Sequence, residues 1–216
     1  MGVQAIIFDY GNVLDHVDDP RPWLARRDAV AARFNMSGDA FWDLLYQTEP
    51  WQECKRGRMT YPVFWNAILS PLGLTDSAQQ AKLVDELFEG RDHINAQMVQ
   101  LLRELKPHYR LGVLSNTHDP HMAVRIRDQH GLKNVFDDVV SSAAVGLAKP
   151  DPEIYWLALQ RLDAAPGEAL FVDDMLRNTR AAQALGIPAI LFENPAKLQQ
   201  ELKERGLLPD SPSGAG

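Results

Sequence analysis

The feature that most constrains this chain is a set of five short apolar runs, several of which end abruptly in a polar residue. The runs occupy residues 5–8, 111–114, 139–140 with their flanks, 169–172 and 189–192. Continuous apolar runs of this length are typical of parallel strands that are covered by helices on both faces. We therefore expect a parallel sheet that is buried in the middle of the molecule.

Helical patterns lie between and after the later runs, at residues 95–106, 151–162, 176–185 and 195–205. The first of them repeats apolar residues at helical spacing, and the second begins with Asp151 as a potential N-cap followed by Pro152. Strands that alternate with helices form βαβ units with right-handed crossovers. The predicted fold class is therefore α/β, a Rossmann-like open parallel sheet with helices on both faces.

The segment from residue 16 to residue 92 breaks this alternation, because it contains four amphipathic helical patterns and no convincing strand. We expect an all-α cap subdomain over residues 16–92, inserted after the first strand of a core formed by residues 1–15 and 93–208. Its core is expected to contain most of the large aromatic side chains, namely Trp23, Phe41, Trp42, Trp51, Phe64 and Trp65. An insertion at this point lies above the carboxyl edge of the sheet, where open α/β sheets bind ligands.

Composition narrows the possible partners. The chain has 216 residues, with 22 basic and 29 acidic side chains that give a net charge of −7, and such an acidic protein lacks the basic footprint of a nucleic-acid binder. One cysteine excludes an internal disulfide. With no signal pattern and no apolar run approaching the ~18 residues of a membrane span, we expect a cytoplasmic protein without a membrane partner. The Pro- and Gly-rich residues 209–216 are predicted to be disordered. The sequence indicates no oligomeric state.

Polar side chains follow four of the predicted strands, at or just beyond their carboxyl ends: Asp9, Ser115, Asn116, Lys149, Asp173 and Asp174. Each of them alone is more typical of a turn, a helix cap or a solvated surface. In a parallel sheet, however, these positions converge on one rim. Carboxylates there would suit a hard cation such as Mg²⁺, and a hydroxyl with an ammonium would suit a phosphate.

Four stretches together resemble the motifs of the haloacid dehalogenase superfamily of phosphohydrolases: Phe8-Asp9-Tyr10-Gly11-Asn12-Val13-Leu14, Leu114-Ser115-Asn116, Lys149-Pro150-Asp151-Pro152-Glu153-Ile154-Tyr155 and Phe171-Val172-Asp173-Asp174. The resemblance covers almost the whole chain and includes a small helical cap. The residues of the first motif most resemble those of one branch of the family. This branch contains the glucose-1-phosphate phosphatase-like enzymes and the phosphatase domain of epoxide hydrolases.

The resemblance implies a phosphatase that acts on a small phosphorylated metabolite, expected to be a sugar phosphate. Asp9 would be the nucleophile that forms an aspartyl phosphate. Mg²⁺ would be held by Asp9, the backbone carbonyl of Gly11 and Asp174, with Asp173 as a direct or indirect partner. Ser115 and the Asn116 amide would bind phosphate oxygens, and Lys149 would neutralise charge on the phosphate and on the nucleophile.

Gly11 departs from the family pattern. Most phosphatases of the family have a second Asp there, which protonates the leaving group and then activates water. Losing a general acid/base costs ~10²–10⁴ in rate. If no other group supplies the proton, the enzyme should prefer leaving groups of low basicity. His118, shortly after the second motif, is the candidate substitute.

Two alternatives remain open at this point. A haloacid dehalogenase also uses an Asp nucleophile but needs no metal, and the pair Asp173-Asp174 argues against it. A protein that has lost catalysis and only binds a phosphorylated ligand is favoured by Gly11. A phosphomutase is less favoured, because its transfer uses the acid/base that Gly11 replaces.

Overall fold

The structure is a computed structural model that describes residues 2–91, 93–128, 132 and 134–208. The sequence-based expectation of disorder for residues 209–216 lies outside these described residues. Within them, no helix is both long enough and apolar enough to cross a membrane.

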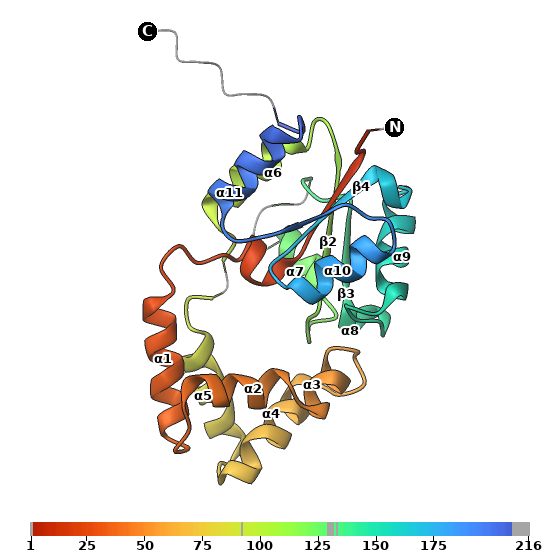
Figure 1. The fold of residues 1–216 in the computed structure, drawn as a ribbon. Coiled ribbons are helices and arrows are strands. Elements are labelled where there is room, and N and C mark those ends of the chain that lie inside the picture. The colour runs from red at the N-terminus through yellow and green to blue at the C-terminus, as the bar shows by residue number, and fades with distance from the viewer. Residues whose placement is uncertain (1, 92, 129–131, 133, 209–216) are drawn as a thin grey trace, which may run out of the picture.

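Five parallel strands form the centre of the molecule (Figure 1). Their order across the sheet is β3-β2-β1-β4-β5, so β1 is central and pairs with both β2 and β4. The strands are β1 (Ala5–Phe8), β2 (Arg110–Ser115), β3 (Asp138–Ser141), β4 (Ala169–Asp173) and β5 (Ala189–Leu191). All pairings are parallel, which confirms the predicted fold class.

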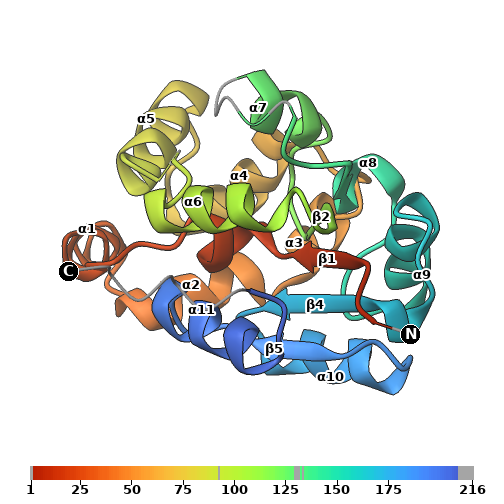
Figure 2. The same cartoon turned by 90° about the horizontal axis from the view of Figure 1, so that it is seen from above.

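Helices cover both faces of the sheet, and the alternation of side chains along β1 separates the two apolar cores. Ile6 and Phe8 pack toward one face, with side chains from α6 (Ala96–Leu105), α7 (Met122–Asp128) and α11 (Pro195–Glu204). Ala5 and Ile7 pack toward the other face, with α9 (Pro152–Arg161) and α10 (Leu176–Ala184). In Figure 2, α6 and α11 lie on one side of the strands and α9 lies on the other.

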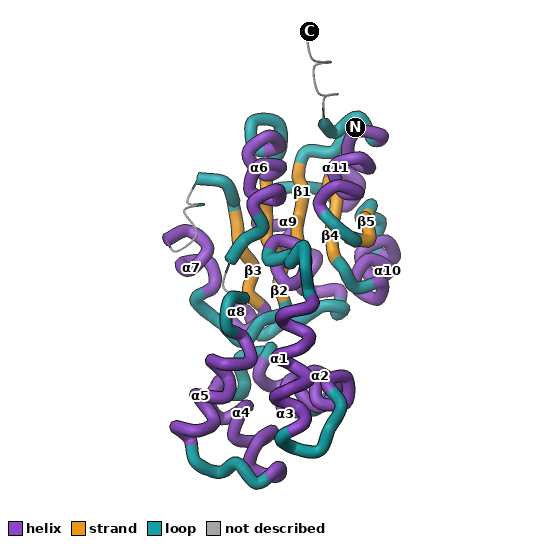
Figure 3. The backbone as a smooth tube through the Cα atoms, turned by 90° about the vertical axis from the view of Figure 1, so that its left-hand side faces the viewer, coloured by secondary structure: helices purple, strands orange, loops and turns teal. Residues whose placement is uncertain are grey.

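The chain leaves the sheet after β1 through a kinked turn at Tyr10–Leu14 and builds a set of helices beyond the carboxyl end of the strands (Figure 3). These are α1 (Arg21–Ala32), α2 (Gly38–Tyr46), α3 (Glu49–Cys54), α4 (Tyr61–Leu69), the 3₁₀ turn Ser70–Leu72 and α5 (Ser77–Phe88). We call α1–α5 the helical segment. It has its own apolar core, in which Phe41, Phe64 and Trp65 are buried and Trp42 and Trp51 are partly buried.

The two connections between the helical segment and the sheet are tied to each other. The backbone N–H of Asn95 donates to the carbonyl of Leu14 at 2.8 Å, and the Asn95 side chain donates to the carbonyl of His16 at 3.1 Å. Arg91 forms an ion pair with Asp15 at 3.4 Å. The segment therefore begins and ends at one hydrogen-bonded place beside β1.

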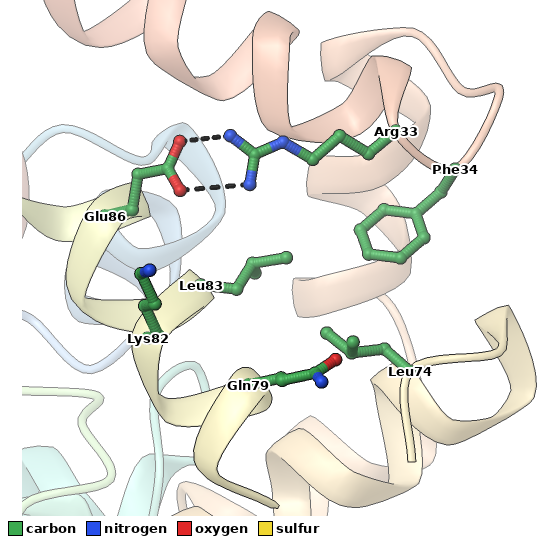
Figure 4. Close-up of a pocket in the computed structure, with 7 residues that line it drawn as sticks. All are labelled: Arg33, Phe34, Leu74, Gln79, Lys82, Leu83 and Glu86. Atoms are coloured by element: carbon green, nitrogen blue, oxygen red, sulfur yellow. Dashed lines mark hydrogen bonds and ion pairs between the residues drawn. The ribbon is translucent and has the colours of Figure 1, made fainter. Parts of the chain in front are cut away.

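A surface hollow lies within the helical segment, between the end of α1 and α5 (Figure 4). An ion pair between Arg33 and Glu86 spans its rim, and Phe34, Leu74 and Leu83 supply its apolar wall. None of its lining residues belongs to the polar set predicted at the rim of the sheet.

Candidate active site

Lys149 lies between two carboxylates that come from neighbouring strands. Its Nζ is 2.9 Å from Asp9 Oδ1 and 2.6 Å from Asp173 Oδ2, and its side chain is 1% exposed. The backbone N–H of Asp9 donates to the carbonyl of Val172 at 2.8 Å, which extends the pairing of β1 with β4 by one residue. Asp9 therefore projects at the rim, and the site that the sequence predicts from separate stretches is assembled there.

Asp173 and Asp174 have different surroundings. Asp173 is fully buried, and its carboxylate accepts hydrogen bonds from the N–H of Met175 at 2.8 Å and from the Asn178 side chain at 3.0 and 3.1 Å, besides the Lys149 contact. Asp174 is half-buried and accepts from the Asn12 side chain at 3.0 Å. The oxygens of Asp173 are thus engaged by protein donors, whereas Asp174 is the more accessible carboxylate.

The chemistry of this donor set fits a divalent cation. Carboxylate oxygens of Asp9, Asp173 and Asp174 all lie within 4.8 Å of one another. Burial raises the pKa of Asp9 well above its usual range; Lys149 opposes this, and the charges of Asp173 and Asp174 add to it. Burial likewise raises the pKa of Asp174. Three carboxylates and one ammonium leave two uncompensated negative charges, which a hard cation with a preference for oxygen ligands would balance.

Lys149 keeps its charge in this buried place. Burial lowers its pKa, but the charges and hydrogen bonds of Asp9 and Asp173 outweigh that effect, so its pKa stands above the usual value. A buried ammonium in contact with two carboxylates is a fixed positive charge. It can hold Asp9 in place and face a phosphate dianion at the same time.

The Asn116 side chain holds the backbone of Lys149. Its Nδ2 donates to the carbonyl of Lys149 and its Oδ1 accepts from the Lys149 N–H, both at 2.8 Å. The backbone N–H of Asn116 and the hydroxyl of Ser115, at the end of β2, are the groups that could meet a phosphate. The assignment of Ser115 and Asn116 to the phosphate stays a prediction, but the amide concerned is the backbone one.

His118 does not have the surroundings of a proton donor. Its ring stacks on Tyr61 of the helical segment, with ring centres 3.7 Å apart and planes inclined by 12°. Burial lowers the pKa of His118 to about 4, so the ring is neutral at neutral pH. The structure therefore argues against His118 as the group that replaces the acid missing at Gly11.

The loop between α3 and α4 is docked on the core next to this site. Arg56 Nη2 is 2.7 Å from the Asp151 carboxylate. Asp151 occupies the N-cap position of α9, but its side chain makes no capping hydrogen bond and pairs with Arg56 instead. Gly57 has a positive φ of 69°, and a Cβ there would lie 2.2 Å from the carbonyl oxygen of Ala143, in α8 (Ser142–Val145).

We expect Gly57→Ala to weaken this docking. The substitution places a methyl group against a backbone oxygen and also costs about 1–2 kcal/mol of left-handed strain. The expected result is an increase of roughly tenfold in the KM of the enzyme, because binding energy from such docking contributes to substrate positioning. Gly73→Ala is the matched control, since Gly73 has a φ of 88° but free space around the added Cβ. Equal effects of the two variants on KM and Tm would contradict a role for the Gly57 contact.

Comparisons with known proteins agree with this geometry. The family described as haloacid dehalogenase-like hydrolase matches residues 3–186. The sesquiterpene phosphatase astK of Aspergillus oryzae is 30% identical over 189 residues, which cover 81% of this chain and 95% of that protein. The D-ribitol-5-phosphate phosphatase of Bacteroides thetaiotaomicron is 25% identical over 209 residues, covering 93% and 97% of the two chains.

Solved structures show the same architecture. A haloacid dehalogenase family enzyme of Bacteroides thetaiotaomicron, in complex with magnesium and inorganic phosphate, superposes with a TM-score of 0.70 at 23% identity. The match covers 91% of this chain and 99% of that chain, so it includes the helical segment as well as the sheet.

Proposed function

The chain belongs to the haloacid dehalogenase-like hydrolase family, and from this premise we propose that it is a Mg²⁺-dependent phosphatase of small phosphomonoesters. One observation carries the proposal. At the carboxyl rim of the sheet, Lys149 Nζ lies 2.9 Å from a carboxylate oxygen of Asp9 and 2.6 Å from one of Asp173. The more accessible carboxylate of Asp174 lies beside them. This arrangement offers a nucleophile, a fixed positive charge and a cation site within one small volume.

In the proposed reaction Asp9 attacks the phosphorus atom, and the alcohol of the substrate leaves. A carboxylate is a weak nucleophile, so its rate depends on orientation and on cancelling its repulsion with the phosphate dianion. The Asp9 carboxylate is oriented by the N–H of Tyr10 at 2.6 Å and by Lys149 at 2.9 Å. Lys149 also supplies part of the cancelling charge. Hydrolysis of the resulting aspartyl phosphate restores Asp9.

Three groups would hold Mg²⁺ in this proposal: the Asp9 carboxylate, the carbonyl of Gly11 and the Asp174 carboxylate. Mg²⁺ bound there would supply positive charge to the phosphate oxygens during transfer. Asp173 acts differently, because its oxygens are engaged by Asn178, Met175 and Lys149. We assign it to positioning Lys149 rather than to direct coordination.

Variants of the two adjacent acids should separate these roles. We expect Asp174→Asn to raise the Mg²⁺ concentration for half-maximal activity by at least about tenfold, with little change in Tm, because it removes a charged oxygen ligand. We expect Asp173→Ala to lower stability by about 3–5 kcal/mol, because it leaves a buried ammonium with one partner fewer. Activity titrations with Mg²⁺ and thermal unfolding measure both effects. The reverse pattern would exchange the two roles.

We propose that the helical segment, with residues 16–92 as its bounds, is a cap that selects the substrate. Its α3–α4 loop contacts the core through Arg56 and Gly57, beside Lys149. The expected substrate class is a small phosphorylated metabolite, with a sugar or polyol phosphate as the first candidate. The D-ribitol-5-phosphate phosphatase supports this choice, because this chain matches 97% of its length.

The test is phosphate release from a panel of substrates, measured with Mg²⁺ present. The panel should contain sugar and polyol phosphates, aryl phosphates and an isoprenoid phosphate, because one relative is a sesquiterpene phosphatase. We expect turnover of at least one of these classes. Halide release from a 2-haloacid without phosphate release from any substrate would instead support the dehalogenase interpretation. Saturable binding of a phosphorylated ligand without turnover would support a binding protein.

A further inference from the structure

A second lysine lies close to the proposed catalytic group but comes from the helical segment. Lys55 directly follows α3, and it is only 4% exposed. The next two residues of its loop are the ones docked on the core, Arg56 on Asp151 and Gly57 against Ala143. Docking of the loop therefore fixes where the Lys55 side chain can lie.

The ammonium of Lys55 has no partner among the described residues of the chain: no carboxylate or carbonyl there accepts a hydrogen bond or forms an ion pair with it. The negative charge of Asp151 attracts the Lys55 ammonium, but Asp151 is already paired with Arg56 at 2.7 Å. The other charges that act on Lys55 are positive, from Arg56 of its own loop, Arg177 of α10 and Lys149. An ammonium at the end of a largely buried side chain, with other cations around it, is unfavourable unless an anion completes the site.

Gly11 lacks the side chain that would carry a proton donor at the proposed site. It has no side chain, although a Cβ there would meet nothing within 4 Å. The acid that most phosphatases of the family carry at this position is therefore absent, and among the described residues no atom beyond its chain neighbours lies within 4 Å of where its Cβ would be. His118, stacked on Tyr61, is neutral at neutral pH.

We propose that Lys55 is the catalytic residue that protonates the leaving group, in place of the acid absent at Gly11. The proposal rests on the phosphatase function proposed above. Attack in line from Asp9 places the leaving oxygen on the opposite side of phosphorus, toward the helical segment. The loop of Lys55 reaches the site from that segment, so its ammonium is the donor that the fold brings to the leaving side.

The proton balance over the two steps is complete. In the first step an Asp9 oxygen bonds to phosphorus, the bond between phosphorus and the leaving oxygen breaks, and the Lys55 ammonium gives its proton to that oxygen. The alcohol departs and Lys55 is left as a neutral amine. In the second step water attacks phosphorus from the vacated position and gives a proton to the amine. Asp9 is released as a carboxylate, and inorganic phosphate leaves.

The titration of Lys55 agrees with this role. Burial, together with the positive charges of Arg56, Arg177 and Lys149, lowers the pKa of Lys55 to about 8, although Asp151 opposes the shift. A general acid/base works best when its pKa lies near the operating pH. The kcat/KM for a substrate that needs protonation should therefore decline above pH of about 8 in the wild type.

The experiment compares leaving groups in Lys55→Met. With D-ribitol 5-phosphate, whose leaving group is a basic primary alkoxide, we expect kcat/KM to fall about 100-fold. With 4-nitrophenyl phosphate, whose leaving group needs little protonation, we expect a fall of only about threefold to fivefold. Across substituted phenyl phosphates the variant should show a steeper dependence on leaving-group pKa than the wild type. Its decline in activity above pH 8 should disappear.

Two further variants and one control make the outcome decisive. Lys55→Arg keeps the charge but releases no proton, so it should resemble Lys55→Met. Gly11→Asp, added to Lys55→Met, should recover part of the alkyl phosphate activity, because its Cβ has free space. Arg58→Met, which removes an exposed positive charge in the same loop that is paired with Glu53 at 2.8 Å, should behave as wild type.

Several results would overturn the proposal. They are an equal loss on both substrates, rescue by Lys55→Arg, or an unchanged leaving-group dependence. Any of these, with the wild type active and Asp9→Asn inactive, would leave the phosphatase function intact and reject only Lys55. Thermal unfolding should show that Lys55→Met keeps its fold, since methionine fills similar space without a buried charge. If it does not fold, Lys55→Gln serves for the same comparisons.

Discussion

Asp9→Asn should lose at least about 10⁴-fold in kcat, the order of loss found when a catalytic nucleophile is removed. The amide has nearly the same shape as the carboxylate but cannot attack phosphorus. The fold should persist, because the amide oxygen can still accept the hydrogen bonds that Lys149 and the N–H of Tyr10 donate to Asp9. Single-turnover phosphate release and thermal unfolding measure the two parts of this result.

Asp163→Asn is the matched control for that variant. The Asp163 side chain is almost fully exposed, just after α9, and it forms an ion pair with Arg110 at 3.3 Å. It should change neither turnover nor Tm. Activity of Asp9→Asn within a few-fold of wild type, at an unchanged Tm, would disprove the assignment of the nucleophile.

Removing Mg²⁺ with excess EDTA should reduce phosphate release to the level of Asp9→Asn, and adding Mg²⁺ back should restore it. The carboxylates of Asp9 and Asp174 lie next to each other, and without a cation they repel both each other and the substrate. Ca²⁺ should restore less than about a tenth of the activity, because it takes more ligands at longer distances and would hold Asp9 by both oxygens.

Phosphate release in EDTA can also contradict the Mg²⁺ dependence. Full turnover in excess EDTA would show that the acidic group does not work through a cation, and it would favour the metal-independent dehalogenase chemistry. Thermal unfolding in EDTA, with and without Mg²⁺, provides an independent readout. Mg²⁺ should raise the Tm of the wild type, since a ligand that binds only the folded state stabilises it.

The sheet and the polar residues at its carboxyl rim could be predicted because their signals are local. A buried parallel strand is a short apolar run, and Asp9 and Asp173 each stand at the end of such a run. Parallel pairing then brings these ends together without further information. Four of the helices around the sheet were also predictable, from apolar spacing and from helix-start chemistry.

The remaining parts depend on contacts between distant residues, which no local pattern shows. Lys149 alone is typical of a solvated residue, yet it is buried because two carboxylates from β1 and β4 surround it. Asn178 was missed because a polar residue inside an amphipathic helix gives no sign that it binds a carboxylate. Lys55 was missed for the same reason, since its burial follows from how the loop docks.

Short elements and ambiguous residues account for the other differences. The helices α3, α7 and α8 were not predicted, because six, seven or four residues are too few for a helical period to stand out. Asp151 was correctly placed at a helix start, but its carboxylate binds Arg56 instead of capping the helix. An acid at that position serves either purpose, and only the tertiary structure decides between them.

The backbone hydrogen bond from Asn95 to Leu14 brings the two ends of the helical segment together at one point beside β1, which we call the neck. The register of β1 with β2 is set by their own pairing, Ala5 opposite Arg110 through Phe8 opposite Val113, and does not depend on the length of the loop. The entropy of closing a loop changes only slowly with its length. Another insertion of different size could therefore be joined at this neck while the strands and the acids at their ends stay in place. Under the proposed role of the helical segment as a cap, the chemistry and the choice of substrate could thus vary independently in this architecture.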